Sequence, residues 1–301
     1  MPRVSIVLPT WNRAAFVGHA IASVQQQTFE DWELALVDDG STDATAQVVR
    51  AFLRDPRIRY LQKPRRGQAA ARNAGIAATS ARFVCFLDSD DFWPAGKLAE
   101  QVAVADDNPG FDVFYGEEDE VDAQARPLET RRMKRHAGDV LVPLLKDNFV
   151  PMSSAMVRRT ALEAVGGFDE ALRRADDYDL WLRLSLRHRF HYSPGTWSYC
   201  RVMPAQLSSD KEARFAANEL IVDRVLARAA DRLSPATARW ARAMLQVRRS
   251  RYYASRGRSL LAASTALRSL ALLPYSSLTW RALARSLLSG VAGGSGAPPN
   301  H

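Results

Sequence analysis

Five short apolar runs recur through the first 115 residues of the chain, and stretches with helical spacing separate them. The runs are 4–8, 33–37, 58–61, 83–87 and 111–115, and the helical stretches are 14–27, 43–54, 68–79 and 95–105. Strands that alternate regularly with helices are joined by right-handed crossovers, which place them in a mostly parallel sheet. The sequence therefore predicts an α/β fold with helices flanking that sheet.

The run 83–87 has no polar alternation, and it ends directly in Asp88-Ser89-Asp90-Asp91. An unbroken apolar run suits a strand that is covered on both faces of a parallel sheet. Ligands of such sheets bind beyond the carboxyl ends of the strands. Carboxylates clustered there repel one another, and a bound Mg²⁺ or Mn²⁺ with hard oxygen ligands relieves the repulsion. A solvated turn that caps the next helix is the alternative interpretation.

Two other runs also end in polar residues. Pro9 and Thr10 follow the first run, and Asp39-Gly40-Ser41 follows the second. The carboxyl ends of neighbouring parallel strands lie at the same edge of a sheet. We therefore expect three polar clusters to converge at one edge.

The chain becomes less regular after residue 115. An acidic patch at 116–122 and a basic one at 131–136 indicate a strand-and-loop excursion around the site. The pattern predicts a short helix over 162–170, stopped by Gly166-Gly167, and a longer helix over 175–189. These segments complete a first domain over residues 1–210.

From residue 211 the pattern is helical throughout, with breaks at Ser234-Pro235, Gly257 and Pro274. We expect a helical extension over 211–289, in which 236–256 and 258–272 could form a helical hairpin, and a flexible tail over 290–301. Residues 211–301 contain 15 Lys and Arg against 4 Asp and Glu, whereas residues 1–210 contain 26 against 29. The net charge of +8 therefore belongs to the extension.

The bulk composition is that of an ordinary globular protein, with 47% apolar and 25% charged residues. The two cysteines, Cys85 and Cys200, provide neither a metal-binding spacing nor a disulfide framework, so a reduced, cytoplasmic protein is expected. No apolar run is long enough to span a membrane. The sequence pI of about 9.8 suggests nucleic-acid binding, but the net-acidic first domain and the lack of a nucleic-acid-binding motif argue against it.

Six motifs occur in a fixed order along the first domain. They are VSIVLPTWNR (4–13), LALVDDGSTDAT (34–45), GQAAARNAGIAAT (67–79), VCFLDSDDFW (84–93), GGFDEAL (166–172) and DDYDLWLRL (176–184). Together they resemble the inverting family-2 glycosyltransferases of the GT-A fold, which use nucleotide-sugar donors. The resemblance covers roughly residues 3–210 and implies a Rossmann-like GT-A domain followed by an α-helical C-terminal extension.

The resemblance assigns a donor-binding role to nine residues: Pro9, Thr10, Asn12, Arg13, Asp39, Gly67, Arg72, Asp88 and Ser89. Asp39 corresponds to the family aspartate that accepts a hydrogen bond from the uracil ring N–H. The stretch containing Thr10 packs around that base. Arg72 corresponds to a residue near the base or the diphosphate, and a salt-bridged arginine on a helix surface is the alternative.

The stretch 88–91 matches the family's Asp-x-Asp motif. By this resemblance Asp88 contacts the ribose, and Asp90 holds an Mg²⁺ or Mn²⁺ ion that neutralises charge on the departing diphosphate. Asp91 orients the loop or caps a helix. Many relatives carry a histidine after the last core strand, whereas the corresponding stretch here offers Met203.

Asp176 and Asp177 match the family's pair of acidic residues near the acceptor. Inversion requires a carboxylate that removes the proton of the acceptor hydroxyl as it attacks the anomeric carbon. Asp177 aligns with this base and Asp176 with a helper. The alternative is that both acids only stabilise a helix N-terminus.

The resemblance implies transfer of a sugar from a nucleotide-diphospho-sugar, with a UDP-sugar as the expected donor, to a hydroxyl of a carbohydrate, glycolipid or lipid-linked acceptor in envelope polysaccharide or glycolipid synthesis. A non-catalytic nucleotide-sugar-binding protein with a helical interaction tail is the alternative. The basic extension suggests peripheral contact with the inner face of the membrane. Its helices could instead pack on the catalytic domain with their arginines solvated.

Overall fold

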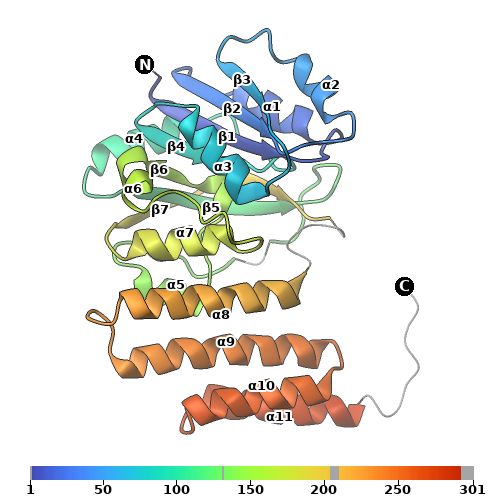
Figure 1. Ribbon diagram of the computed structural model, residues 1–301, viewed down its shortest axis with the longest axis vertical. Coiled ribbons are helices and arrows are strands. Elements are labelled where there is room, and N and C mark those ends of the chain that lie inside the picture. The colour runs from blue at the N-terminus through green and yellow to red at the C-terminus, as the bar shows by residue number, and fades with distance from the viewer. Residues whose placement is uncertain (1, 131, 204–209, 293–301) are drawn as a thin grey trace. The chain divides into compact units, whose positions relative to one another are not determined.

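The computed structural model describes residues 2–130, 132–203 and 210–292 (Figure 1). The chain divides into two compact units, Met1–Ser209 and Asp210–His301. The first is an α/β unit and the second consists of helices. The presence of an α/β unit followed by a helical unit confirms the predicted α/β fold with an α-helical extension.

The first unit contains a seven-stranded mixed sheet in the order β3-β2-β1-β4-β6-β5-β7. The strands are β1 (Val4–Thr10), β2 (Trp32–Asp38), β3 (Ile58–Gln62), β4 (Phe83–Phe86), β5 (Val113–Val121), β6 (Met156–Arg158) and β7 (Phe190–Arg201). Only β6 runs antiparallel to its neighbours, so the sheet is mostly parallel as predicted.

The helices of this unit connect the strands. They are α1 (Val17–Gln25), α2 (Thr45–Arg50), α3 (Gln68–Ala77), α4 (Lys97–Asp107), α5 (Leu141–Lys146), α6 (Arg159–Ala164) and α7 (Asp176–Ser185), with a 3₁₀ turn at Met152–Ser154. The predicted boundaries for the helix at 162–170 were wrong, because α6 begins and ends earlier. Gly166 and Gly167 have φ values of 75° and 67°, which end the helical path before residue 166.

The strand predicted over 111–115 extends further than expected. β5 continues to Val121, so most of the acidic stretch 116–122 lies within a strand. The pairing of β5 with β7 is irregular around Glu117, and the side chains of Glu117 and Glu118 reach different polar partners, Arg135 and Ser198. Strands β6 and β7 follow no pattern that had been recognised in the sequence.

The two faces of the sheet carry different helices. Val4, Ile6 and Leu8 of β1 pack with apolar residues of α1, α2 and α4 in one buried cluster. On the opposite face α3 approaches so closely that a Cβ atom on Gly75 would lie 2.5 Å from Val7 Cγ1. Glycine at position 75 therefore permits α3, which carries Arg72, to lie directly against the strands.

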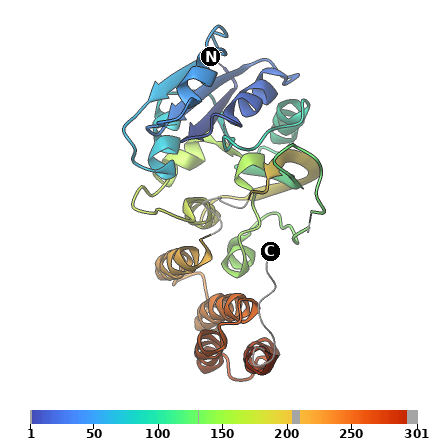
Figure 2. The same ribbon diagram turned by 90° about the vertical axis from the view of Figure 1, so that its right-hand side faces the viewer.

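The second unit consists of α8 (Lys211–Arg228), α9 (Pro235–Ser255), α10 (Ser259–Leu272) and α11 (Ser277–Ala292), stacked as Figure 2 shows. The predicted breaks are confirmed. Ser234 Oγ accepts the N–H of Thr237 at 3.1 Å and caps α9, and Gly257 has a φ of 69° between α9 and α10. The predicted helical hairpin is also present, with Ser250 Oγ of α9 bonded to Ala262 O of α10 at 2.8 Å.

Helix α11 runs to Ala292, and the rest of the predicted tail, residues 293–301, lies outside the described residues. Within the described part of the chain, no helix combines the length and the apolar character needed to cross a membrane.

Candidate active site

The carboxyl ends of β1, β2 and β4 lie next to one another at one edge of the sheet. Thr10 at the end of β1 pairs in register with Asp38 at the end of β2. Val7, three residues earlier in β1, pairs with Phe86 at the end of β4. The polar residues that follow these strands therefore share one edge, which confirms their predicted convergence.

Asn12 joins the loop after β1 to the loop after β2. Its backbone lies in the left-handed region with φ 51°, and its N–H donates to Ser41 Oγ at 3.0 Å. Its Oδ1 accepts the N–H of Thr42 at 2.8 Å. The N–H of Arg13 donates to Thr45 Oγ1 at 2.9 Å. Asn12, assigned to the donor site by the resemblance, thus has its side chain engaged in holding two loops together.

Asp39 is buried, and both of its carboxylate oxygens accept backbone N–H groups from the loop before α3. Oδ1 accepts from Arg66 at 2.6 Å and Oδ2 from Gly67 at 2.8 Å. Gly67 has a φ of 102°, a conformation that favours glycine. A carboxylate offers about four acceptor positions, so these two bonds leave room for a further donor such as a ring N–H.

A cation–aromatic stack lies beside this loop. The guanidinium carbon of Arg65 is 3.4 Å from the ring centroid of Trp11, which follows directly after β1. Neither residue had been assigned a role from the sequence, although Trp11 occurs within the first quoted motif. Thr10, beside Trp11, is buried, and its hydroxyl has no hydrogen-bond partner among the residues that the structure describes.

The loop after β4 is held from several sides. The N–H of Asp88 donates to Ser153 Oγ at 3.2 Å, and Ser153 Oγ in turn donates to Asp91 Oδ2 at 2.6 Å. Asp91 Oδ1 accepts the N–H of Arg201 from β7 at 3.2 Å. Asp91 is therefore a buried residue that orients the loop, while Ser89 is buried beside it.

Arg72 connects this loop to α7. Its guanidinium group donates from Nη2 to Asp88 Oδ1 and from Nη1 to Asp176 Oδ2, both at 2.6 Å. Gln68 Nε2 adds a 3.1 Å bond to Asp88 Oδ1. Arg72 is only 2% exposed, and these two carboxylates raise its pKa against the effect of burial. The interpretation of Arg72 as a helix-surface arginine was wrong, because it lies inside the protein.

The acids of α7 begin directly after a strained residue. Ala175 has a φ of 57°, which is uncommon for a residue other than glycine, and it sets the direction in which the helix starts. Burial raises the pKa of Asp176, Arg72 lowers it, and the neighbouring carboxylates Asp177 and Asp88 raise it further. Asp176 is thus a buried carboxyl group paired to Arg72, beside the half-buried Asp177.

Asn148 is a candidate functional residue that the sequence did not reveal. Its Nδ2 donates to Asp177 Oδ2 at 2.8 Å, and its own Oδ1 is buried without a hydrogen-bond partner within the described ranges. The amide orients one oxygen of Asp177. Asn148 lies after α5 in a segment without periodic pattern, so no signal in the sequence could have identified it.

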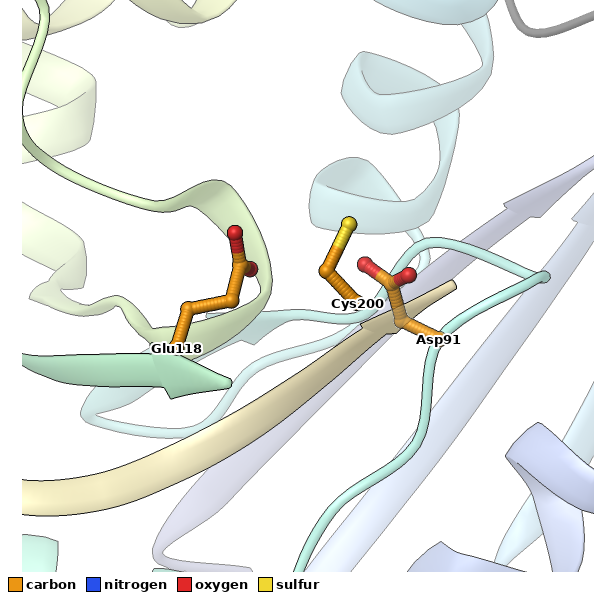
Figure 3. Close-up of side chains that lie close together, drawn as sticks. All are labelled: Asp91, Glu118 and Cys200. Carbon is orange, nitrogen blue, oxygen red and sulfur yellow. The ribbon is translucent and has the colours of Figure 1, made fainter. Parts of the chain in front are cut away.

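A second polar cluster lies between the β4 loop and the last two strands of the sheet, where Figure 3 shows Asp91, Glu118 and Cys200 pointing toward one another. Each offers a potential ligand atom, and these three atoms lie within 4.8 Å of one another. Burial raises the pKa of Glu118 to about 7, against a hydrogen bond from Ser198. Burial and the adjacent carboxylates also raise the pKa of the Cys200 thiol.

Two groups of residues could therefore be considered for a divalent metal. Asp90 provides hard carboxylate oxygens, as Mg²⁺ and Mn²⁺ prefer, and Arg13 Nε lies 3.5 Å from its Oδ2. The cluster of Asp91, Glu118 and Cys200 combines two acids with a thiol whose raised pKa keeps it protonated. Carboxylate oxygens alone suit Mg²⁺ or Mn²⁺ better than a set that includes a protonated thiol.

Several neighbouring residues are structural. Trp181 of α7 is fully buried, so it belongs to the core. His188 Nδ1 lies 2.8 Å from Asp112 Oδ2, and His191 packs against Phe111, so both histidines have structural partners.

Comparisons with known proteins identify the family. The family described as glycosyl transferase family 2 matches residues 5–166, more than half of the 301-residue chain. The chain belongs to glycosyl transferase family 2. The resemblance drawn from the six motifs is thereby confirmed.

Curated relatives match about 60% of this chain. An uncharacterized glycosyltransferase of Rickettsia bellii is 31% identical over 186 residues, which make up 62% of this chain and 27% of that protein. The chain thus covers less than a third of that relative's length. The UDP-Glc:alpha-D-GlcNAc-diphosphoundecaprenol beta-1,3-glucosyltransferase WfgD of Escherichia coli is 32% identical over 60% of this chain and 69% of its own length.

Solved structures confirm the GT-A fold. TarS 1–349 of S. aureus in complex with UDP-GlcNAc superposes with a TM-score of 0.72 at 20% identity, over 95% of this chain and 89% of that one. The mannosyltransferase PcManGT of Pyrobaculum calidifontis, in complex with GDP-Man and Mn²⁺, gives a TM-score of 0.61 at 22% identity, over 96% and 86% of the two chains.

Proposed function

We propose that this glycosyltransferase moves a sugar from a UDP-sugar to an acceptor hydroxyl with inversion at the anomeric carbon, assisted by Mg²⁺ or Mn²⁺. The observation that carries the proposal is the position of Arg72. Its guanidinium bonds Asp88, in the loop that matches the donor motif, and Asp176, beside the proposed base. A single buried cation thus connects the proposed donor-binding loop to the segment that carries the proposed base.

The donor-binding part of the site would use residues that follow the strands of the sheet. Asp39 retains acceptor capacity for the uracil ring N–H, and Trp11, stacked under Arg65, supplies an aromatic surface near the same loop. Pro9 and Thr10 lie at the end of β1, where they would pack around the base. Complexes of TarS with UDP and UDP-GlcNAc, and the UDP-Glc in the name of WfgD, favour UDP as the nucleotide.

Proton removal would fall to Asp177. The acceptor O–H would give its proton to the carboxylate as the oxygen bonds to the anomeric carbon and the bond to the nucleotide diphosphate breaks. Asn148 holds one oxygen of Asp177 at 2.8 Å and so directs the other toward the acceptor. Asp176 is engaged by Arg72, which suits a helper that positions the start of α7.

Asp90 would hold the metal, with Arg13 beside it. When bound, the ion would neutralise charge on the departing nucleoside diphosphate. Arg13 contributes a permanent positive charge 3.5 Å from Asp90, which would also act on the phosphates. The complex of PcManGT with GDP-Man and Mn²⁺ supports Mn²⁺ as a cofactor in this fold.

The acceptor would be a carbohydrate, glycolipid or lipid-linked saccharide of the cell envelope. The name of WfgD describes a diphosphoundecaprenol-linked acceptor, and RfbC of Myxococcus xanthus, 36% identical over 61% of this chain, is named as an O-antigen biosynthesis protein. Cys85 and Cys200 are both unpaired, in keeping with the cytoplasmic location predicted from the sequence.

The test is nucleotide release from a panel of UDP-, GDP- and TDP-sugars with Mn²⁺, with and without a chelator. We expect metal-dependent release of UDP by the full chain, and a large loss in Asp177→Asn. Asp107→Asn is the matched control, because Asp107 is an exposed acid at the end of α4. If a nucleotide-sugar binds but no nucleotide is released, even after cell-envelope extract is added as a source of acceptors, a non-catalytic sugar-nucleotide-binding protein is favoured instead.

A further inference from the structure

In the last two helices the fully buried residues are mostly small, whereas several large apolar residues are exposed. The buried residues are Ala262, Thr265, Ala266 and Ser269 of α10 and Thr279, Ala282 and Ser286 of α11. A helix of a water-soluble bundle normally buries its leucines and exposes its small polar residues. Contacts through small residues bring α10 and α11 close together, and among the large apolar side chains Leu272, Leu273 and Leu283 are partly buried against the inner cluster of the unit.

The most exposed large apolar residues fall on one side of each helix. Leu260 and Leu267 of α10 are 89% and 54% exposed, and Trp280, Leu287 and Leu288 of α11 are 53%, 60% and 69% exposed. Leu260 and Leu267 are seven residues apart, as are Trp280 and Leu287, so each pair lies on one face two turns apart. We call these five residues, together with the arginines described next, the outer face.

Three arginines accompany these residues. Arg268 on α10 and Arg281 and Arg285 on α11 are exposed, and Arg281 shares its side of the helix with Leu288, seven residues later. The sequence has ten arginines and no acidic residue between Leu233 and its C-terminus. The outer face therefore combines large apolar side chains with charged residues that are all arginines.

Figures 1 and 2 show α10 and α11 side by side at the end of the helical unit, with α9 between them and α8. The inner sides of α9, α10 and α11 meet in one small apolar cluster that includes Met244, Val247, Ala266 and Ala282. This cluster accounts for the cohesion of the three helices. The outer face is thus not needed to hold the unit together, and it is available to a partner.

We propose that the outer face binds the surface of an anionic lipid membrane. Leucine side chains insert into the boundary between headgroups and acyl chains, and tryptophan favours that interface. The N–H of Trp280 is already bonded to Pro274 O at 2.8 Å, so the ring can enter an apolar layer without an unsatisfied donor. Arginines at the same level contact lipid phosphates.

A second copy of the chain fits this face less well than a lipid surface does. Two outer faces in contact would bring Arg268, Arg281 and Arg285 of both copies together with no acidic residue from that part of the sequence to pair with them. Like charges buried at an interface are costly. An anionic bilayer instead supplies a counter-charge for each arginine. The proposal concerns the helical unit and does not depend on the activity of the first unit.

The first test is flotation of the full-length protein with vesicles made of equal parts phosphatidylglycerol and phosphatidylcholine, or of phosphatidylcholine alone. We expect binding to the anionic vesicles at low salt, weakening as salt is added. Each basic residue at the surface changes the partition coefficient about fivefold, so replacing Arg268, Arg281 and Arg285 by glutamine lowers it about 100-fold. Arg239→Gln, at an exposed arginine of α9, is the matched control and retains binding.

The second test reports on insertion. Brominated acyl chains should quench the fluorescence of Trp280, and the quenching should disappear in Trp280→Phe. Leu287→Ser with Leu288→Ser should weaken binding, whereas Leu220→Ser, at an exposed leucine of α8, should not. Absence of flotation with anionic vesicles at low salt overturns the proposal. So does a protein dimer that forms without lipid and dissociates in the variant with both serines.

Discussion

Replacing Arg72 by methionine should destabilise the first unit strongly at neutral pH. The guanidinium is 2% exposed and bonds Asp88 and Asp176 at 2.6 Å each. Methionine keeps the apolar stem but leaves both carboxylates without their cation. Breaking a buried ion pair in this way costs about 3–5 kcal/mol, and Tm should fall by roughly 6–20 °C.

The loss of stability in Arg72→Met should depend on pH. The pKa of Asp176 is already raised, and removing Arg72 takes away the group that opposes this shift. An acid whose pKa is higher in the folded state than in the unfolded state destabilises the fold as pH rises, because the unfolded chain loses its proton first. The variant should therefore lie closer to the wild type near pH 4 than at pH 7.

Urea unfolding followed by tryptophan fluorescence measures this difference. Adding Asp176→Asn to Arg72→Met should recover about 1 kcal/mol or more at pH 7, because the unpaired charge is removed. Arg72→Lys should rescue only partly, since an ammonium group cannot bond both carboxylates in fork geometry. A loss below about 1 kcal/mol, or an equal loss at pH 4 and pH 7, would refute the role assigned to Arg72.

Four further outcomes are expected. Asp90→Ala should abolish sugar transfer with the circular dichroism spectrum unchanged, and full activity in this variant or in excess chelator would contradict the metal assignment. Asp177→Asn should lower kcat by roughly 10²–10⁴-fold with donor affinity, measured by calorimetry, near that of the wild type. Asn148→Ala should lower kcat about tenfold at unchanged donor KM, the effect of one hydrogen bond to a charged group. In metal-free buffer Glu118→Gln should raise stability by about 1–3 kcal/mol at pH 8 and leave it unchanged near pH 4, because the pKa of Glu118, about 7, makes its ionised form unfavourable.

The sequence predicted the fold where one physical signal was strong. The apolar runs that became β1, β2 and β4 are buried on both faces, so they lack polar alternation and stand out, as do the helix breaks at Gly257 and Pro274. Strands β6 and β7 were missed for the opposite reason. β6 has three residues, and β7 mixes buried and exposed positions because it lies at the edge of the sheet.

The candidate site was predicted where motifs carry it and missed where tertiary structure creates it. Asp88, Arg72 and Asp176 were each assigned by the family resemblance, but their mutual contact depends on how α3 and α7 meet. Asn148 reaches Asp177 across 29 positions of sequence from an irregular segment. Glu118 lies in an acidic stretch whose place in a strand becomes apparent only once β5 pairs with β7.

Anomalous diffraction from a crystal of the full-length protein grown with UDP and Mn²⁺ would locate both ligands. We expect a manganese peak at the Asp90 carboxylate and the uracil ring against Asp39 and Trp11. Asp177 should face the open side of the site beyond the diphosphate. A manganese peak at Asp91, Glu118 and Cys200, or UDP bound away from the edge formed by β1, β2 and β4, would contradict the proposed site.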